Sequence, residues 1–87
     1  MGILAPGADE RVKGVQFSAD DIRVELMDGR TIGVPLAWYP RLLDATAAQR
    51  DNWQPCGGGY GIHWPELDED LSTEGLLRGA PAPQRAG

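Results

Sequence analysis

The sequence predicts a small α+β domain: an antiparallel sheet of three to four strands with two or three short helices packed on one face. Three observations predict this class. Apolar and polar residues alternate with a period of two through residues 12–36, the spacing changes to that of a helix near residue 40, and a strand-like run returns at 60–64. The elements follow in the order strand, strand, strand, helix, helix, strand, helix, which indicates helices packed against an antiparallel sheet.

The first two strands are expected to form a hairpin. Val15 and Phe17 share one face of the first strand, and Ile22 and Val24 share one face of the second. A four-residue loop at 18–21 sets Phe17 opposite Ile22 and Val15 opposite Val24. This register gathers the apolar side chains on one face of the sheet.

The second hairpin turns at Asp28 and Gly29. A two-residue loop would place Val24 opposite Gly33 and would send the apolar residues of the two strands to opposite faces. A three-residue loop at 27–29 pairs Val24 with Ile32 instead, provided that Gly29 adopts the left-handed conformation of a bulge. We therefore expect the longer loop.

Two short helices are expected after the third strand. Pro40 suits the first turn of a helix, where its missing N–H group needs no partner. Thr46, followed three residues later by Gln49, is a capping-box pattern that predicts the start of the second helix. Trp53 is expected to pack near the end of that helix.

The last strand and the last helix are expected within residues 60–79. Ile62 and Trp64 point to one side of the strand and His63 to the other. The glycine run at 57–59 before it predicts a flexible connection. Ser72 is a typical N-cap residue, and Gly79 stands where a helix often ends at a glycine.

The ends of the chain differ in composition from its middle. We expect a flexible leader at 1–10, one domain at 11–79 and a disordered tail at 80–87, because the two ends are rich in glycine, alanine and proline. A chain of 87 residues is near the small end of what folds alone, so its core is expected to be thin.

The charge balance weighs against several kinds of partner. Thirteen acidic residues against eight basic ones give a formal charge of -5, so direct binding to nucleic acid is not expected. No apolar run approaches the roughly 20 residues that span a bilayer, so no membrane contact is expected. Cys56 is the single cysteine, which permits no intrachain disulfide and favours a reducing cytoplasm.

His63 and the acidic residues after it are the first candidates for a metal or acid/base site. The acidic segment consists of Glu66, Asp68, Glu69 and Asp70. Its spacing from His63 matches neither an EF-hand loop nor the helical H-E-x-x-H pattern. We therefore expect no metal and no cofactor here, and a solvated acidic turn that favours the N-terminus of the last helix.

Other catalytic arrangements have weaker support. A nucleophilic mechanism would need Cys56 next to His63 together with a helix N-terminus or a fixed cation to activate the thiol, and neither is evident. Residues 57–61 are glycine-rich but lack the Lys-Ser/Thr pair of a phosphate-binding loop. No catalytic residue is expected, and the chain is predicted not to be an enzyme.

The large rings favour a different function. They are Trp38, Tyr39, Trp53, Tyr60 and Trp64. Core packing explains many of these rings, but five exceed what one thin apolar face must hide. Surplus rings with an arginine nearby, here Arg41, are typical of protein interfaces.

Two long segments of the sequence resemble a known family. The segments "DGRTIGVPLAWYPRLLDATAAQRDNW" and "GGGYGIHWPELDEDLSTEGLLRG" resemble the bacterial domain-of-unknown-function family 2442 over residues 12–79. The resemblance implies a small α+β domain with no established enzyme activity, often encoded beside another small protein in what looks like a toxin-antitoxin pair. Some relatives are fused to a helix-turn-helix, and we expect no such DNA-binding segment within residues 1–87. The positions that match the family signature are Trp38, Tyr39, Pro40, Arg41, Trp53, His63, Trp64, Asp68, Glu69 and Asp70.

The first expectation is therefore a cytoplasmic protein-interaction module, the antitoxin-like or regulatory member of a two-gene pair. Its acidic segment would meet a basic protein partner, and Trp38, Tyr39 and Arg41 would anchor the contact. One alternative is a metal-dependent or small-molecule-binding protein that uses His63 with Asp68 or Asp70. The other is a homodimer without a ligand, in which sheet edges or exposed rings pair between chains.

Overall fold

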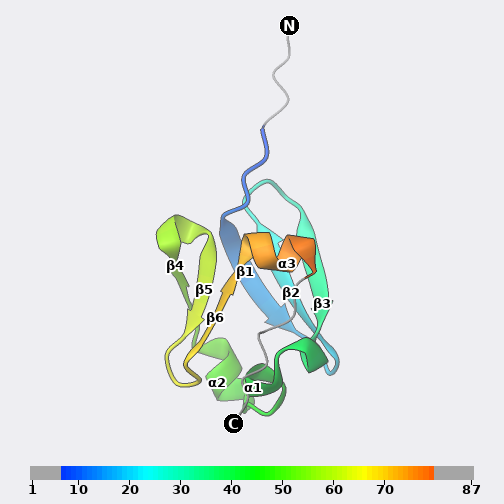
Figure 1. Ribbon diagram of the computed structural model, residues 1–87, viewed down its shortest axis with the longest axis vertical. Coiled ribbons are helices and arrows are strands. Elements are labelled where there is room, and N and C mark those ends of the chain that lie inside the picture. Colours follow the sequence, from blue (N-terminus) through cyan, green and yellow to red (C-terminus); the bar gives the residue numbers. More distant parts are fainter. Residues whose placement is uncertain (1–6, 80–87) are drawn as a thin grey trace, which may run out of the picture.

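The computed structural model describes residues 7–79 and contains two antiparallel sheets of three strands each (Figure 1). The first sheet has the order β1-β2-β3, with β1 at Val12–Phe17, β2 at Asp21–Leu26 and β3 at Thr31–Pro35. The second has the order β4-β5-β6, with β4 at Gln54–Cys56, β5 at Gly61–Trp64 and β6 at Glu69–Ser72. The helical segments are η1 (Leu36–Trp38), α1 (Pro40–Leu43), α2 (Ala47–Asp51), η2 (Gly57–Gly59) and α3 (Thr73–Arg78).

The α+β class and the predicted order of elements are confirmed, and β4 and β6 are added to them. Both hairpin registers of the first sheet are also confirmed. Phe17 lies opposite Ile22, and Val24 lies between Val15 and Ile32. The loop between β2 and β3 has the three residues 27–29, and Gly29 takes a φ of 97° there. Gly29 therefore adopts the left-handed bulge conformation that the apolar pattern predicted.

The helix ends follow the predicted capping residues. Pro40 occupies the first turn of α1. The Thr46 hydroxyl accepts a hydrogen bond from the N–H of Gln49, and the Gln49 side chain accepts one from the N–H of Thr46, so the capping box at α2 is complete. At α3, the Ser72 hydroxyl accepts from the N–H of Gly75, and Gly79 ends the helix in the left-handed conformation.

The core lies between the two sheets and is closed by the helical segments. The apolar faces of β2 and β5 supply fully buried residues such as Val24 and Ile62. Phe17 of β1 meets Trp64 of β5 edge to face, with 6.3 Å between the ring centroids. Figure 1 shows α1 and α2 at one end of both sheets, and α3 lies toward the other end, where it contacts β3 and β6. The helices thus close the space between two sheets, whereas the sequence predicted helices on one face of a single sheet.

The second sheet has two more strands than the sequence predicted. Its outer strands, β4 and β6, show little alternation of apolar and polar residues, so the sequence did not indicate them. The strand β4 has three residues, one of them Pro55, which suits an edge strand because proline donates no ladder hydrogen bond. The strand β6 buries only Leu71, so the acidic residues around it look like a loop in the sequence. Glu69 and Asp70, expected in a solvated turn, are instead strand residues opposite Trp64 and His63.

The described part of the leader is attached to the domain. The N–H of Asp9 donates to a carboxylate oxygen of Asp28 at 3.0 Å, and Glu10 lies 3.5 Å from the guanidinium of Arg30. The rest of the predicted leader, 1–6, and the predicted tail, 80–87, lie outside the described residues. Among residues 7–79, no helix is long and apolar enough to cross a membrane.

Candidate functional site

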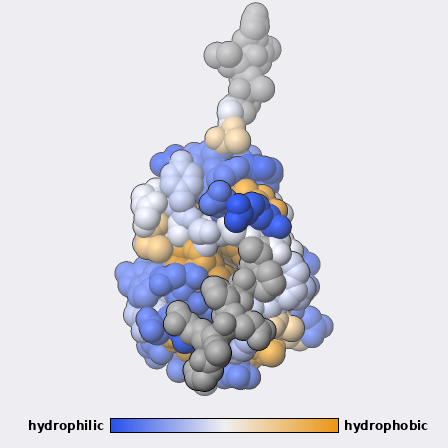
Figure 2. All heavy atoms as spheres, in the orientation of Figure 1, coloured by the Kyte–Doolittle hydropathy of each residue, from blue (hydrophilic) through white to orange (hydrophobic). Residues whose placement is uncertain are grey.

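One end of the molecule gathers carboxylates from four different segments. These segments are the β1–β2 turn with the first residue of β2, the C-terminal end of α1, the helix α2 and the β5–β6 turn, which Figure 1 shows together at the end opposite η2. We call this region the acidic end, and its carboxylates belong to Asp20, Asp21, Asp44, Asp51, Glu66 and Asp68. All are exposed except the half-buried Asp21. In the view of Figure 2, hydrophilic residues cover the left side of this end.

Hydrogen bonds hold these segments together. The N–H of Leu36 donates to the carbonyl of Asp20 at 2.8 Å, which joins η1 to the β1–β2 turn. The side-chain amide of Asn52, just after α2, donates to the carboxylate of Glu66 at 2.7 Å. Together with the hydrogen bonds of Arg41 and Arg50 to main-chain carbonyls, these contacts make the acidic end one connected surface.

Arg41 of α1 is occupied by the β5–β6 turn. Its Nη1 donates to the carbonyl of Asp68 at 2.6 Å and lies 3.9 Å from the Asp68 carboxylate. Asp68 has a φ of 52°, a left-handed conformation that a non-glycine residue adopts at some cost. Arg41 thus helps to fix a strained turn and leaves the Asp68 carboxylate, whose side chain is 94% exposed, facing solvent.

Arg50 of α2 is also committed to main-chain oxygens. Its Nε donates to the carbonyl of Leu42 at 2.8 Å and its Nη2 to the carbonyl of Leu43 at 2.9 Å. The guanidinium lies 5.4 Å from the ring centroid of Phe17, within range of a cation–π interaction. The guanidiniums of the two helices at the acidic end are therefore engaged by the protein, and the carboxylates of these helices and of the β5–β6 turn are what a partner would meet.

Four of the five aromatic candidates lie in or against the core, and the fifth, Tyr60, is 51% exposed. Tyr39 is 1% exposed, so it packs inside and offers no surface anchor. Burial raises the pKa of the Tyr39 hydroxyl, and the negative charge of Glu69 adds to that shift. Trp38 and Trp53 are half-buried and pack against the core, so only part of each ring faces solvent.

His63 and Asp70 form a pair on the outer face of the second sheet. They lie opposite each other on β5 and β6, with His63 Nδ1 and Asp70 Oδ1 2.6 Å apart. Asp68 does not join them, because it lies in the turn held by Arg41. Within residues 7–79, no three His, Cys, Asp or Glu side chains gather as metal ligands would. Asp70 thus fixes the orientation of the His63 imidazole.

Cys56 lies on the same outer face, over Gly61. A Cβ atom built on Gly61 would stand 2.7 Å from Cys56 Sγ, so the sulfur fills the space that a side chain would take. This close approach requires glycine at position 61 unless the thiol rotates away. The sequence pattern gave no sign of it, because the contact depends on the pairing of β4 with β5.

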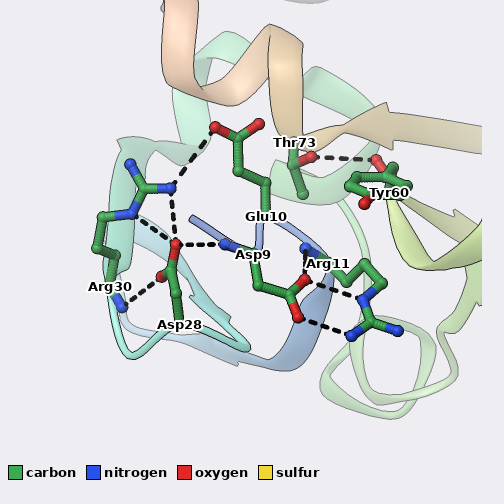
Figure 3. A network of polar contacts seen from close by, with 7 residues as sticks. All are labelled: Asp9, Glu10, Arg11, Asp28, Arg30, Tyr60 and Thr73. Atoms are coloured by element: carbon green, nitrogen blue, oxygen red, sulfur yellow. Dashed lines mark hydrogen bonds and ion pairs between the residues drawn. The ribbon is translucent and has the colours of Figure 1, made fainter. Parts of the chain in front are cut away.

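A second polar cluster lies at the opposite end, around the β2–β3 turn (Figure 3). Asp28 accepts hydrogen bonds from the N–H and Nε of Arg30, each at 3.0 Å, and from the N–H of Asp9. These donors hold the pKa of the Asp28 carboxyl well below its usual value of 3.8, with the Arg30 side chain as the largest cause. Asp9 is paired with Arg11 at 2.6 Å, and this hydrogen bond lowers the pKa of Asp9.

The lowered pKa of Asp28 predicts a loss of stability in acid. A carboxyl whose pKa is lower when folded stabilises the fold above its unfolded pKa of 3.8, and this contribution disappears as the pH falls toward the folded value. We expect the melting temperature to fall between about pH 5 and about pH 2, and the gap between wild type and Asp28→Asn to shrink over that range. Thermal melts followed by circular dichroism test this. A constant gap across the range would contradict it.

Comparisons with known proteins identify the family of the chain and support its fold. The model of a family described as "Protein of unknown function (DUF2442)" matches residues 12–82. The chain belongs to the DUF2442 family. The resemblance stated from the sequence is thereby confirmed, and a search of curated proteins finds no match.

Two solved structures resemble this DUF2442 chain. A crystal structure of a protein of unknown function from Rhodospirillum rubrum ATCC 11170 has 30% sequence identity and a TM-score of 0.71, with 85% of this chain and 92% of that chain covered. A solution NMR structure of the uncharacterized protein CV0863 from Chromobacterium violaceum has 24% identity and the same TM-score of 0.71, with 84% and 69% covered. The second likeness concerns the fold alone. Neither neighbour is described with an activity.

Proposed function

We propose that this DUF2442 chain is a cytoplasmic protein-interaction module and not an enzyme, and that its acidic end docks on a basic surface of a protein partner. The observation that carries this is the imbalance of available charge. Six carboxylates from four segments share one end, while Arg41 and Arg50 of the same end are engaged by main-chain carbonyls. A surface of one sign steers an oppositely charged partner and makes association sensitive to salt.

The position of the acidic end supports docking as a unit. The β5–β6 turn is joined to α1 by Arg41 and to α2 by the contact between Asn52 and Glu66. Carboxylates held by such contacts lose less conformational freedom on binding than those of a loose tail. Tyr39 is buried, so the anchoring role expected for it from the sequence is wrong.

The first partner to test follows from the family resemblance. Since relatives are often encoded beside another small protein, we propose the product of the neighbouring gene as the partner, with this chain as the antitoxin-like or regulatory member. Co-purification of the two proteins, followed by stopped-flow measurement of their association rate at several salt concentrations, tests the pairing.

Matched charge variants make the test specific. Glu66→Gln with Asp68→Asn neutralises two carboxylates of the acidic end, and Asn suits the left-handed conformation at 68. We expect the association rate at low salt to fall about tenfold. Glu25→Gln with Glu74→Gln removes the same charge outside the acidic end and should change the rate about twofold or less. Equal effects of the two pairs, or no complex between the two proteins, would refute the proposal.

Self-association is distinguished in the same preparation. Sedimentation of the isolated chain reports whether it forms a homodimer without a partner. A dimer that the Glu66 and Asp68 replacements leave intact, together with no heteromeric complex, would favour the homodimer alternative.

A further inference from the structure

Residues 9–11, which we call the strap, contact the β2–β3 turn of the first sheet and η2, which connects β4 to β5 of the second sheet. On the first sheet, the strap lies along the β2–β3 turn. The N–H of Asp9 donates to Asp28 Oδ2 at 3.0 Å, and the N–H of Asp28 donates back to the carbonyl of Asp9 at 3.2 Å. The N–H of Met27 donates to the carbonyl of Arg11 at 2.9 Å. The strap is thus bonded to this turn through its backbone.

On the second sheet, the strap meets η2 through the side chain of Arg11. A Cβ atom built on Gly59 would lie 3.2 Å from Cγ of Arg11, so the stem of the arginine rests directly on the Gly59 backbone. Gly59 has a φ of 98°, which L side chains rarely adopt. Position 59 therefore needs glycine both for its conformation and for this contact.

The conformation of Arg11 is fixed by the strap itself. Its Nε donates to Asp9 Oδ1 at 2.9 Å, and its Nη2 lies 2.6 Å from Asp9 Oδ2 (Figure 3). This two-point pairing orients a long side chain that would otherwise sample many rotamers. Asp9 thus contacts the first sheet through its backbone and the Arg11 side chain through its carboxylate.

The next contacts continue into the second sheet. The residue after Gly59 is Tyr60, whose carbonyl accepts from the N–H of Thr73 at 2.9 Å and lies 3.4 Å from the Thr73 hydroxyl. Thr73 is 1% exposed and begins α3. A shift of η2 would therefore change the position of Tyr60, just before β5, and weaken its hydrogen bonds with Thr73 at the start of α3.

We propose that the strap is a coupling device that transmits changes at the β2–β3 turn to η2 on the other sheet. The path runs from Asp28 to Asp9, then through the carboxylate of Asp9 to Arg11, and from the Arg11 stem to Gly59. Each step is a contact of a described residue. The ionic step joins Asp9 and Arg11, whose side chains are 31% and 50% exposed, so it is accessible to screening by salt. A ligand or partner that engages the β2–β3 turn would alter the order of η2 without touching it.

Hydrogen exchange of the full chain, followed by NMR, tests the coupling. In Asp28→Ala we expect the amides of Tyr60 and Thr73 to exchange about fivefold faster relative to the core amide of Val24, although Asp28 lies on the other sheet. Arg11→Ala should produce the same acceleration at these two amides. Normalising to Val24 removes the effect of a general loss of stability.

The control is a carboxylate at the opposite turn of the same sheet. Asp20→Ala should leave the exchange of Tyr60 and Thr73 within about twofold of wild type. If Asp28→Ala does not fold, Asp28→Asn keeps one acceptor oxygen while it removes the charge that pairs with Arg30, and the same pattern is expected with a smaller amplitude. Acceleration confined to residues 9–11 and 27–30 in these variants would overturn the proposal.

Discussion

Replacing Trp64 by alanine is expected to lower the free energy of unfolding by about 3–5 kcal/mol, the range typical of deleting a buried aromatic side chain. Trp64 is 0% exposed and meets Phe17 at 6.3 Å, which is the ring contact that joins the two sheets. Its Nε1 also donates to the carbonyl of Arg50 at 3.0 Å. Urea denaturation followed by far-ultraviolet circular dichroism measures the change.

Two further variants separate the parts of this effect. Small domains have about 5–15 kcal/mol of total stability, so Trp64→Ala can leave little folded protein. Trp64→Phe keeps a ring but loses the N–H donor, and we expect a cost of about 1–3 kcal/mol from the unpaired carbonyl of Arg50 and the smaller ring. Trp53→Ala is the matched control, because that ring is only half-buried. A Trp64→Ala effect no larger than that of Trp53→Ala would contradict this account of the core.

The first sheet could be predicted almost completely from the sequence, because its information is local. The alternation in β2 places Ile22 and Val24 on one face, and only a three-residue loop brings the apolar residues of β3 to the same face. The helix ends were predictable for the same reason. Thr46 and Ser72 each satisfy a main-chain N–H group within three residues, so the signal lies within one turn of chain.

The second sheet could be predicted only in its central strand. Strand β5 carries Ile62 and Trp64 on one face and pairs with a neighbour on each side. Its neighbours have almost no apolar alternation, because β4 contains Pro55 and β6 buries only Leu71. Their strand conformation results from pairing with β5, and tertiary pairing of this kind overrides local propensity.

The candidate site was predictable in charge but not in geometry. The acidic residues at 66–70 were visible in the sequence, but they do not form a single solvated turn. Asp70 pairs with His63 on the second sheet, whereas Asp68 lies at the acidic end. The contributions of Asp20 and Asp44 were not anticipated, because nothing local indicates that α1 and the β1–β2 turn meet there. Hydrogen bonds from arginine to main-chain carbonyls cannot be predicted from a sequence pattern, since every residue has a carbonyl that can accept.

Replacing Arg50 by alanine is expected to lower the free energy of unfolding by about 2–3 kcal/mol, although the residue is polar and was not a candidate from the sequence. The guanidinium donates to the carbonyls of Leu42 and Leu43 at the end of α1, where helix carbonyls lack intrahelical partners. The N–H of Ala45 also donates to the Leu42 carbonyl at 3.2 Å, so the contact with Leu43 is expected to account for more of the loss. It also covers the Phe17 ring at 5.4 Å, and this stacking adds about 0.5–1 kcal/mol at a partly exposed site.

The comparison with Arg41→Ala decides whether these contacts or charge alone explain the effect. Both replacements remove one positive charge from the acidic end, so general repulsion among the carboxylates rises equally. Arg41 is nearly half exposed and serves a surface turn, so its removal is expected to cost about 1 kcal/mol or less. Arg50→Lys separates the two further, since a lysine keeps the charge but cannot reproduce the planar fork that reaches both carbonyls. If Arg50→Lys retains full stability in urea denaturation, the positive charge at position 50 would be sufficient to stabilise the fold. The two hydrogen bonds from α2 to α1 would then not explain the effect of Arg50→Ala.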